Sequence, residues 1–343
     1  MKTLVVNEKH QLQLQDFSEP KIGPYESLVK IRACGICATT DSELIRGTQP
    51  GNKNYPCILG HEAIGEIMET GSKVQKFSKG DFVTRPTALW PGEKKDGLTS
   101  AWGGFAEWGI VRDADAMAAD GDPSLLGNYV ASRQNVVPKD TPLSEAVLAI
   151  SLAETSSWFS HLGSVWGKTV CIAGTGVAGL GLAIWAKFAG AKKVIVLGRR
   201  KERLDLAVEL AADLGINVKE ENAPAVIRQA TGGRGVDIFL EAVGAKDQLL
   251  TGFSVIAGGG VVAVYGVPPN HVYDFDWSKM PGHASISQFP AEEHKTYAWV
   301  ADLLKRGLIP GKKIMTHHWP LADFDRAFRE VGEGKVVKGF LEM

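Results

Sequence analysis

The sequence contains little cysteine and carries almost no net charge. Four cysteines in 343 residues are too few for a disulfide framework. The 38 lysines and arginines nearly balance the 39 aspartates and glutamates, so there is no positive excess to bind a nucleic-acid backbone or an anionic membrane surface. The first residues also lack the basic and then apolar layout of a signal peptide. We therefore expect a cytoplasmic protein that binds neither nucleic acid nor a membrane.

The chain also lacks an uninterrupted apolar segment of membrane-spanning character. Two uncharged runs, 169–186 and 248–269, come near it, but several glycines interrupt each of them and the second ends in two prolines. Glycine and proline at such positions are typical of turns between buried elements. We interpret both runs as buried strands with glycine turns.

The composition fits a folded chain of two domains. Hydrophobic residues make up 44% and charged residues 22%, which excludes wholesale disorder. A domain usually takes about 100–200 residues. Residues 1–113 have short β-branched stretches broken by proline and glycine, which predicts a β-rich region. Residues 114–133 are small and polar, and form either a surface excursion or a short helical insert.

The pattern changes after residue 143 to an alternation of helices and strands. Helices are expected at 144–162, 177–190, 201–215 and 292–308. Buried strands are expected at 169–174, 192–198, 236–244 and 258–268. Strands that alternate with helices of this length predict an α/β fold with a parallel, doubly wound sheet.

A glycine fingerprint lies between the first of these strands and its helix. Gly174, Gly176 and Gly179 form the pattern G-x-G-x-x-G, and the helix opens at Val177. The three glycines permit a tight turn, a close approach to a pyrophosphate, and packing of the helix on the sheet. Free N–H groups at the helix start suit phosphates. The sequence therefore predicts a dinucleotide site; the alternative is a glycine turn without a ligand.

The end of the next strand indicates which dinucleotide binds. An acid that holds the ribose 2′-hydroxyl is expected about twenty residues after the fingerprint, but Gly198, Arg199 and Arg200 stand there. Guanidinium groups suit a 2′-phosphate. We expect NADP(H) in preference to NAD(H); the alternative is a solvated basic helix start.

Candidate metal ligands lie in the first third of the chain. Cys37, His61 and Glu62 offer a thiolate, an imidazole and a carboxylate, which suit zinc. Each residue alone has other interpretations. Cys34 and Cys37 form a C-x-x-C pair that suits redox chemistry or half of a zinc knuckle, and an isolated cysteine or histidine is commonly a core residue.

Together these segments resemble a known family. The matching motifs are GIC at 35–37, GHEAIGEI at 60–67, GD at 80–81 and GGFAEW at 103–108. With the dinucleotide pattern, the chain resembles the zinc-dependent medium-chain alcohol and polyol dehydrogenases over nearly its whole length. The resemblance implies a GroES-like catalytic domain at 1–150, a Rossmann domain at 151–289 and a return to the catalytic domain at 290–343.

The resemblance also implies a ligand set. Zinc would be bound by Cys37, by His61 and by a third residue ahead of the Rossmann fold, where Glu154 matches the acid of polyol and threonine dehydrogenases. Glu62 matches an acid that lies beside the metal and sometimes binds it. For Glu154 the alternative is a solvated helix charge.

Three departures from the family pattern bear on the site. No cysteine lies between Cys57 and Cys171, so we expect one catalytic zinc and no structural zinc. Thr40 replaces a family aspartate that orients the ligand histidine, and Asp41 follows it; either Asp41 takes that role or His61 is held differently. Ser42 replaces a relay histidine, which leaves the proton exit route open.

The resemblance implies a mechanism in which the metal lowers the pKa of a substrate hydroxyl and hydride passes to the nicotinamide. Thr39 matches the hydroxyl that takes the substrate proton. Lys338 matches a basic residue that reaches the cofactor pyrophosphate; the alternative is a surface lysine. Trp90, Trp102 and Trp158 are candidates to line the cleft, with core or surface packing as the alternative.

The leading interpretation is an NADP(H)-preferring zinc dehydrogenase that acts on an alcohol, polyol or sugar, or on the matching carbonyl. A zinc-free quinone or enone reductase of the same superfamily is a second interpretation, and a nucleotide-binding sensor without catalysis is a third. Relatives are homodimers or homotetramers, and the expected partner is a small-molecule alcohol or carbonyl compound.

Overall fold

The computed structural model describes residues 1–49, 52, 54–268, 272–274, 276, 278, 280–282 and 284–343. Pro269, at the end of the second uncharged run, lies outside them. The chain forms two compact units. One unit combines Met1–Ile150 with His294–Met343, and the other is Ser151–Glu293.

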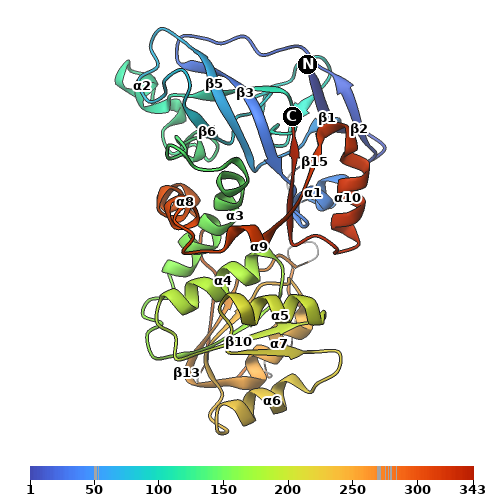
Figure 1. The fold of residues 1–343 in the computed structure, drawn as a ribbon, viewed down its shortest axis with the longest axis vertical. Coiled ribbons are helices and arrows are strands. Elements are labelled where there is room, and N and C mark those ends of the chain that lie inside the picture. Colours follow the sequence, from blue (N-terminus) through green and yellow to red (C-terminus); the bar gives the residue numbers. More distant parts are fainter. Residues whose placement is uncertain are drawn as a thin grey trace. The chain divides into compact units, whose positions relative to one another are not determined.

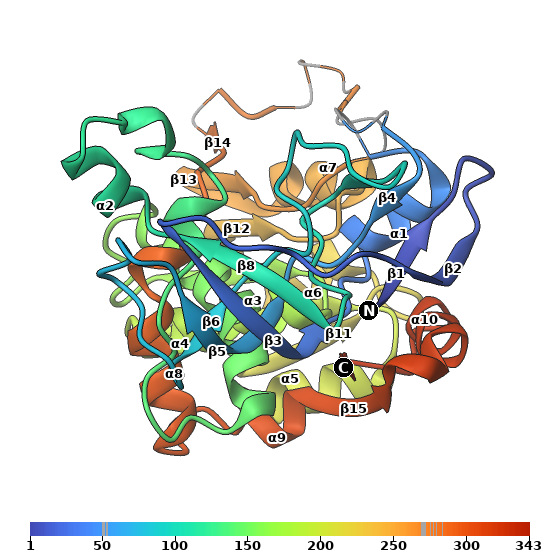
Figure 2. The same ribbon diagram turned by 90° about the horizontal axis from the view of Figure 1, so that it is seen from above.

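The first unit is built on β-sheet. Its strands are β1 (Lys2–Val6), β2 (Leu12–Asp16), β3 (Glu26–Gly35), β4 (Cys57–Ile58), β5 (Ala63–Thr70), β6 (Phe82–Thr84), β7 (Thr99–Ser100), β8 (Trp108–Arg112), β15 (Met315–Pro320) and β16 (Lys338–Glu342). One sheet has the order β2-β1-β4-β7, and the other has the order β15-β16-β3-β5-β6 with β8 also paired to β3. Figure 2 shows β3 beside β8. The predicted β-rich region is therefore confirmed.

Helices in this unit are short. They are α1 (Thr40–Arg46), α2 (Ala114–Ala119), α8 (Tyr297–Lys305), α9 (Gly311–Ile314) and α10 (Phe324–Gly332). The segment 114–133 was expected to be either a surface excursion or a short helical insert. The structure shows a helical insert, since α2 is followed by 3-10 turns at Pro123–Leu125 and Ala131–Arg133. A longer helix, α3 (Leu143–Ser160), runs from the first unit into the second.

The core of the first unit joins distant parts of the sequence. Residues of β1 and β4 pack with Phe105 of the loop after β7 and with Trp319 and Leu341 of the C-terminal strands. Along β3, alternate side chains are buried, as expected for a strand with one face on a core. The C-terminal segment therefore completes a sheet that the N-terminal segment begins.

The second unit is a parallel α/β sheet. Its strands are β9 (Thr169–Ala173), β10 (Lys193–Gly198), β11 (Leu214–Asn217), β12 (Val236–Glu241), β13 (Ile256–Val264) and β14 (Ser285–Ser287). All neighbouring pairs in the order β11-β10-β9-β12-β13-β14 are parallel. The strands of the sheet centre are almost fully buried, which explains their continuous apolar sequences.

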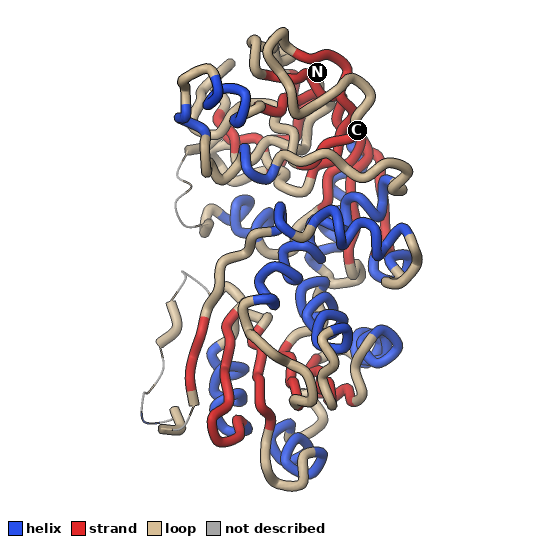
Figure 3. The backbone as a smooth tube through the Cα atoms, turned by 90° about the vertical axis from the view of Figure 1, so that its left-hand side faces the viewer, coloured by secondary structure: helices blue, strands red, loops and turns tan. Residues whose placement is uncertain are grey.

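Helices cover this sheet on both sides. They are α4 (Val177–Phe188), α5 (Lys201–Leu210), α6 (Ala223–Ala230) and α7 (Lys246–Val255). Since parallel crossovers are right-handed and the strand order runs outward in both directions from β9, α4 and α5 lie on one face and α6 and α7 on the other. Figure 1 labels the four helices around this sheet, and Figure 3 shows helices flanking the strands. The predicted Rossmann-type, doubly wound sheet is confirmed.

Four predicted elements differ from the structure. The helix expected at 201–215 ends at Leu210, because Gly215 pairs with Val196 as part of β11. The run at 248–269 begins as helix α7 and only then becomes β13, and the run at 169–186 likewise becomes helix α4 after β9. The helix expected at 292–308 is limited to α8, after a 3-10 turn at Glu293–Lys295. Within the described residues, no helix has the length and apolar character needed to cross a membrane.

Candidate metal and dinucleotide site

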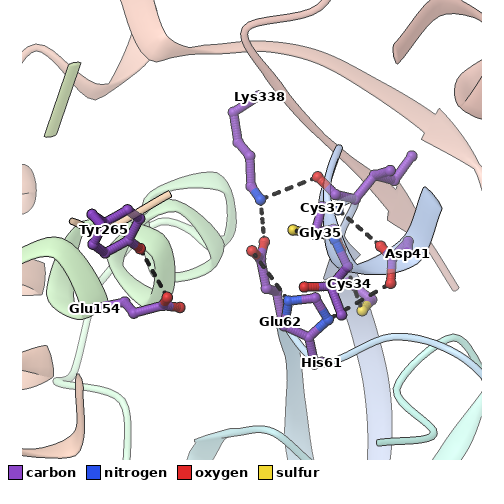
Figure 4. A network of polar contacts seen from close by, with 11 residues as sticks. Cys34, Gly35, Cys37, Asp41, His61, Glu62, Glu154, Tyr265 and Lys338 are labelled. Atoms are coloured by element: carbon purple, nitrogen blue, oxygen red, sulfur yellow. Dashed lines mark hydrogen bonds and ion pairs between the residues drawn. The ribbon is translucent and has the colours of Figure 1, made fainter. Parts of the chain in front are cut away.

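Three of the predicted metal ligands come together where β3 ends and β5 begins. Cys37 follows β3, and His61 and Glu62 directly precede β5; the two strands pair antiparallel, with Cys34 opposite Ala63. The candidate ligand atoms of Cys37, His61 and Glu62 lie within 4.8 Å of one another. In the part of the chain that the structure describes, no other group of three such side chains is found. Figure 4 shows the cluster.

Glycines permit the close approach of the two segments. A Cβ on Gly35 would lie 2.3 Å from the carboxylate Oε2 of Glu62, and one on Gly60 would lie 2.5 Å from the backbone nitrogen of Phe105. Gly60 also has a positive φ of 97°, which glycine adopts without strain. The glycines of the GIC and GHE motifs therefore leave the space that the neighbouring candidate ligands need.

Asp41 holds the other side of His61. Its Oδ1 lies 3.6 Å from Nδ1 of His61, and its Oδ2 accepts a 2.8 Å hydrogen bond from the backbone N–H of Cys37. Although burial opposes protonation, the interactions with Asp41 and Cys37 raise the pKa of His61 well above its usual value. A carboxylate at Nδ1 directs Nε2 toward a metal. Of the two alternatives for Asp41, the geometry favours the one in which it orients His61.

Glu62 lies between His61 and a buried lysine. Its Oε1 is 3.8 Å from Nε2 of His61, while Oε2 forms an ion pair with Nζ of Lys338. Lys338 is 3% exposed, so it is not a surface lysine, and it donates a further 3.1 Å hydrogen bond to the carbonyl of Ile36. Burial disfavours both charges, but the contact lowers the pKa of Glu62 and raises that of Lys338. The predicted contact of Lys338 with a pyrophosphate stays a prediction.

The turn after Cys37 leads directly into a helix. Thr40 opens α1, and its backbone N–H donates a 3.4 Å hydrogen bond to Sγ of Cys37. Thr39 is the N-cap residue of this helix; its side chain is exposed and is not used as a cap. Ser42, at the relay position, is part of α1.

Glu154 lies on α3 in the second unit. Its carboxylate accepts a 2.8 Å hydrogen bond from the hydroxyl of Tyr265, and the buried Trp158 packs edge-on against Tyr265 at 5.3 Å. Trp158 is therefore a core residue. Tyr265 was not predicted from the sequence. Its position directly after β13 is a usable signal, since ligands bind beyond the carboxyl ends of parallel strands.

The glycine fingerprint forms the expected turn between β9 and α4. Gly174 has a φ of 124°, and a Cβ on Gly179 would lie 2.1 Å from the carbonyl oxygen of Gly174. Gly176 is the N-cap residue of α4, which opens at Val177, and a Cβ there would meet nothing within 4 Å. The turn thus has close packing at its first and third glycines and open space at the second, as a pyrophosphate requires.

The two predicted arginines follow β10 beside this turn. A Cβ on Gly198 would lie 2.6 Å from the side chain of Thr175, so the end of β10 contacts the glycine turn. Arg199 and Arg200 are exposed, and Arg200 is the N-cap residue of α5. The exposed guanidinium of Arg199 therefore lies on the loop where this fold places the adenosine ribose.

A small pocket opens beside His61 in the first unit. It is lined by Gly60, His61, Arg85, Pro86, Trp102, Tyr129, Val130 and Arg133. The centroids of the Trp102 and His61 rings lie 5.2 Å apart. Of the two alternatives for Trp102, lining a pocket or packing in the core or on the surface, the structure shows it beside the pocket. Trp90 is buried instead under the guanidinium of Arg112. Tyr129, Val130 and Arg133 come from the helical insert.

Comparison with known proteins gives the same class. Residues 23–120 match the alcohol dehydrogenase GroES-like domain, and residues 178–306 match the zinc-binding dehydrogenase domain. The chain is 30% identical to an L-threonine 3-dehydrogenase of Pyrococcus furiosus, over 95% of this chain and 93% of the relative. It is 26% identical to an erythritol/L-threitol dehydrogenase of Mycolicibacterium smegmatis, over 98% and 95%.

Solved structures share the fold. A benzyl alcohol dehydrogenase from Acinetobacter calcoaceticus has a TM-score of 0.84 at 21% identity, with 100% of this chain and 99% of that chain covered. An alcohol dehydrogenase from Thermus sp. ATN1 has a TM-score of 0.81 at 24% identity, with the same coverage. The chain belongs to the zinc-binding alcohol dehydrogenases of the medium-chain dehydrogenase family, a family of oxidoreductases.

The contact between Asp41 and His61 leads to a prediction about metal affinity. In Asp41→Asn an amide N–H₂ can face Nδ1 of His61, which would favour the tautomer with its proton on Nε2, the metal side. We expect zinc affinity to fall about 10- to 100-fold, measured by competition with a chromogenic chelator. Glu43→Gln removes the same charge from the same helix and should leave the affinity unchanged. Equal zinc affinity in Asp41→Asn and the parent would contradict the orienting role.

Proposed function

We propose that this chain is a zinc-dependent dehydrogenase that transfers a hydride between NADP(H) and the hydroxyl or carbonyl carbon of an alcohol, polyol or sugar. The proposal rests chiefly on the cluster of Cys37, His61 and Glu62, whose donor atoms fit zinc. Asp41 supports it further, because a carboxylate behind the imidazole is the usual neighbour of a zinc-bound histidine.

The proposed ligands are Cys37 and His61, with Glu62 beside them and Glu154 supplied by the second unit. A bound zinc ion would supply a Lewis acid that lowers the pKa of a substrate hydroxyl, as it lowers that of bound water to about 7. The ion pair with Lys338 holds Oε2 of Glu62 and leaves Oε1 on the His61 side. Tyr265 holds Oε1 of Glu154 and restricts the rotation of that carboxylate.

Thr39 is the proposed group for the first proton transfer. A hydroxyl donates and accepts at once, so Thr39 can accept the proton of a substrate alcohol and pass its own onward. Its exposed side chain, two residues after Cys37, supports this role. Since Ser42 cannot act as an imidazole would, water or another group has to complete the exit route.

NADP(H) is the proposed cofactor. The glycine turn, the open position at Gly176 and the N–H groups at the start of α4 suit a pyrophosphate. Arg199 and Arg200 take the place of the acid that would bind a ribose 2′-hydroxyl, and suit a 2′-phosphate. A structure with the same fold, a predicted zinc-binding dehydrogenase from Sinorhizobium meliloti 1021, is bound to NADP (TM-score 0.82, 23% identity, with 100% of this chain and 99% of that chain covered).

The relatives named above suggest substrates that carry several polar groups, since erythritol and L-threitol are polyols and L-threonine is a hydroxy amino acid. All four cysteines are free thiols, which fits a reducing cytoplasm. Assembly as a homodimer or homotetramer is proposed on the family resemblance alone.

Metal dependence tests the proposed function. Protein stripped with a chelator and reconstituted should bind one zinc per chain and oxidise members of an alcohol and polyol panel with NADP. Cys37→Ala should abolish turnover, because the site loses its only thiolate, whereas Cys57→Ala, a buried cysteine outside the cluster, should retain it. Two tightly held zinc ions, or full activity without metal, would refute the proposal.

The arginines predict a cofactor-selective defect. Arg199→Ala should raise the KM for NADP about 10- to 100-fold, the effect of losing a charge-assisted hydrogen bond, and leave the KM for NAD nearly unchanged. Lys201→Ala is the matched control, because Lys201 is an adjacent exposed cation that already pairs with Asp205. Equal losses with NADP and NAD would show that Arg199 does not read the 2′-phosphate.

Thr39 predicts a defect confined to turnover. Thr39→Val keeps the shape and removes the hydroxyl, so kcat should fall by about 10²–10⁴ while zinc and NADP still bind. Thr39→Ser restores a hydroxyl and should retain most activity. If Thr39→Val matches the parent across the pH range, the residue only begins the helix and the proton leaves by another route.

A further inference from the structure

A buried glutamate and a tyrosine meet at the carboxyl end of β12. Glu241 is the last residue of this strand and is fully buried, and its Oε2 accepts a 2.5 Å hydrogen bond from the hydroxyl of Tyr273. Glutamate is rarely buried to this degree unless partners offset its lost hydration. Glu241 also lies opposite Ala173, the last residue of β9, and thus next to the glycine turn.

The side chain of Glu241 holds the loop that follows β12. Its Oε1 accepts hydrogen bonds from the backbone N–H groups of Val243, at 2.8 Å, and of Gly244, at 2.9 Å. Hydrogen bonds from backbone N–H groups to a carboxylate are among the strong ones in proteins. The same loop contacts the glycine fingerprint, since a Cβ on Gly174 would lie 3.1 Å from the carbonyl oxygen of Ala242.

The loop that follows β13 also packs on Glu241. The carbonyl oxygen of Glu241 accepts hydrogen bonds from the N–H groups of Tyr265, at 2.8 Å, and of Gly266, at 2.9 Å. A Cβ on Gly266 would lie 2.5 Å from Oε2 of Glu241. A Cβ on Gly244 would overlap the carbonyl oxygen of Val267, so the two loops contact each other. A shift of Glu241 would therefore be transmitted to both loops.

These two loops lie where the second half of a dinucleotide has to bind. In a doubly wound sheet the dinucleotide lies across the carboxyl ends of the strands, at the switch point of the strand order. The proposed adenosine end lies at Arg199, after β10, and the proposed pyrophosphate lies at the start of α4. The nicotinamide end then extends over the ends of β12 and β13. Val243 and Val267 on these loops are 52% and 39% exposed, and they offer apolar surface to a planar ring.

Tyr273 is well placed to keep the Glu241 carboxylate in position. Burial, together with the hydrogen bond to Glu241, raises the pKa of Tyr273, so the hydroxyl keeps its proton and donates it. The tyrosine packs against the apolar core of the sheet, which holds the ring. Among the described residues, the other hydrogen bond to Oε2 is a 3.1 Å contact from the N–H of Gly244. The Tyr273 hydroxyl is therefore the shortest restraint on that oxygen.

We propose that Tyr273 is a positioning residue for the cofactor: by holding Oε2 of Glu241, it fixes the two loops on which the nicotinamide ring binds. The inference rests on the proposed function, because it requires a dinucleotide on the glycine turn. Tyr273 acts through Glu241 and not by contact with the reacting atoms. Loss of its hydroxyl should therefore affect the nicotinamide half of the cofactor and spare the adenosine half.

Two ligands of different length test the inference without turnover. NADPH carries the nicotinamide ring, whereas adenosine 2′,5′-bisphosphate carries only the adenosine half with its 2′-phosphate. Tyr273→Phe should raise the dissociation constant of NADPH about tenfold, the effect of losing one hydrogen bond to a carboxylate. The dissociation constant of the bisphosphate should stay unchanged. Both constants are measured by calorimetry on zinc-loaded protein.

Two further variants serve as controls. Tyr25→Phe removes a tyrosine hydroxyl that donates to the carboxylate of Asp120 on the surface of the other unit, and it should change neither constant. Arg199→Ala should weaken both ligands, since both carry the 2′-phosphate. A merely structural role of Tyr273 would lower the melting temperature of Tyr273→Phe and leave the ratio of the two dissociation constants as in the parent.

The outcomes separate this inference from the proposed function. If Tyr273→Phe binds NADPH as the parent does, or loses equal affinity for NADPH and the bisphosphate, the positioning role is wrong and the dehydrogenase proposal is untouched. If the parent binds neither ligand, the proposed function fails and the inference fails with it. A selective loss of NADPH affinity in a protein that oxidises no alcohol would support the inference and refute the dehydrogenase.

Discussion

A buried ion pair supports the cluster of Cys37, His61 and Glu62. Lys338 comes from β16, near the C-terminus, and its Nζ neutralises the Glu62 carboxylate and contacts the carbonyl of Ile36. The backbone N–H of Ile36 in turn donates to the carbonyl of Gly339. A buried carboxylate without such a partner would be expensive. The first and last parts of the chain must therefore be folded together before Glu62, and His61 beside it, can take their places.

The chemistry of the cluster follows from how each ligand is held. Asp41 lies on one side of the imidazole and Glu62 on the other, so the two nitrogens of His61 face different carboxylates. The N–H of Thr40 lies against the sulfur of Cys37. These contacts orient the three candidate ligand side chains from outside the cluster, a preorganisation that suits the proposed metal site.

Much of the architecture was predictable because its signals are local. The glycine fingerprint, the strand before it and the helix after it are adjacent in the sequence, and they form the expected turn. The predictions were wrong where contacts with residues distant in the sequence decide the secondary structure. Gly215 follows a helical pattern, but the parallel ladder with β10 makes it part of a strand. The segment 248–255 is uncharged, as a buried strand would be, yet it forms part of α7 against β12 and β13.

The sequence by itself determined the fold class, the dinucleotide turn and the identity of the candidate ligands, because each is written in a short run of residue types with fixed spacing. Only the tertiary structure decided that Asp41 stands behind His61, that Lys338 is buried on Glu62, and that Arg85 and Arg133 share a pocket. These contacts join segments from about 20 to nearly 300 positions apart in the chain. No local pattern encodes them, since they arise when strands pair and bring their ends together.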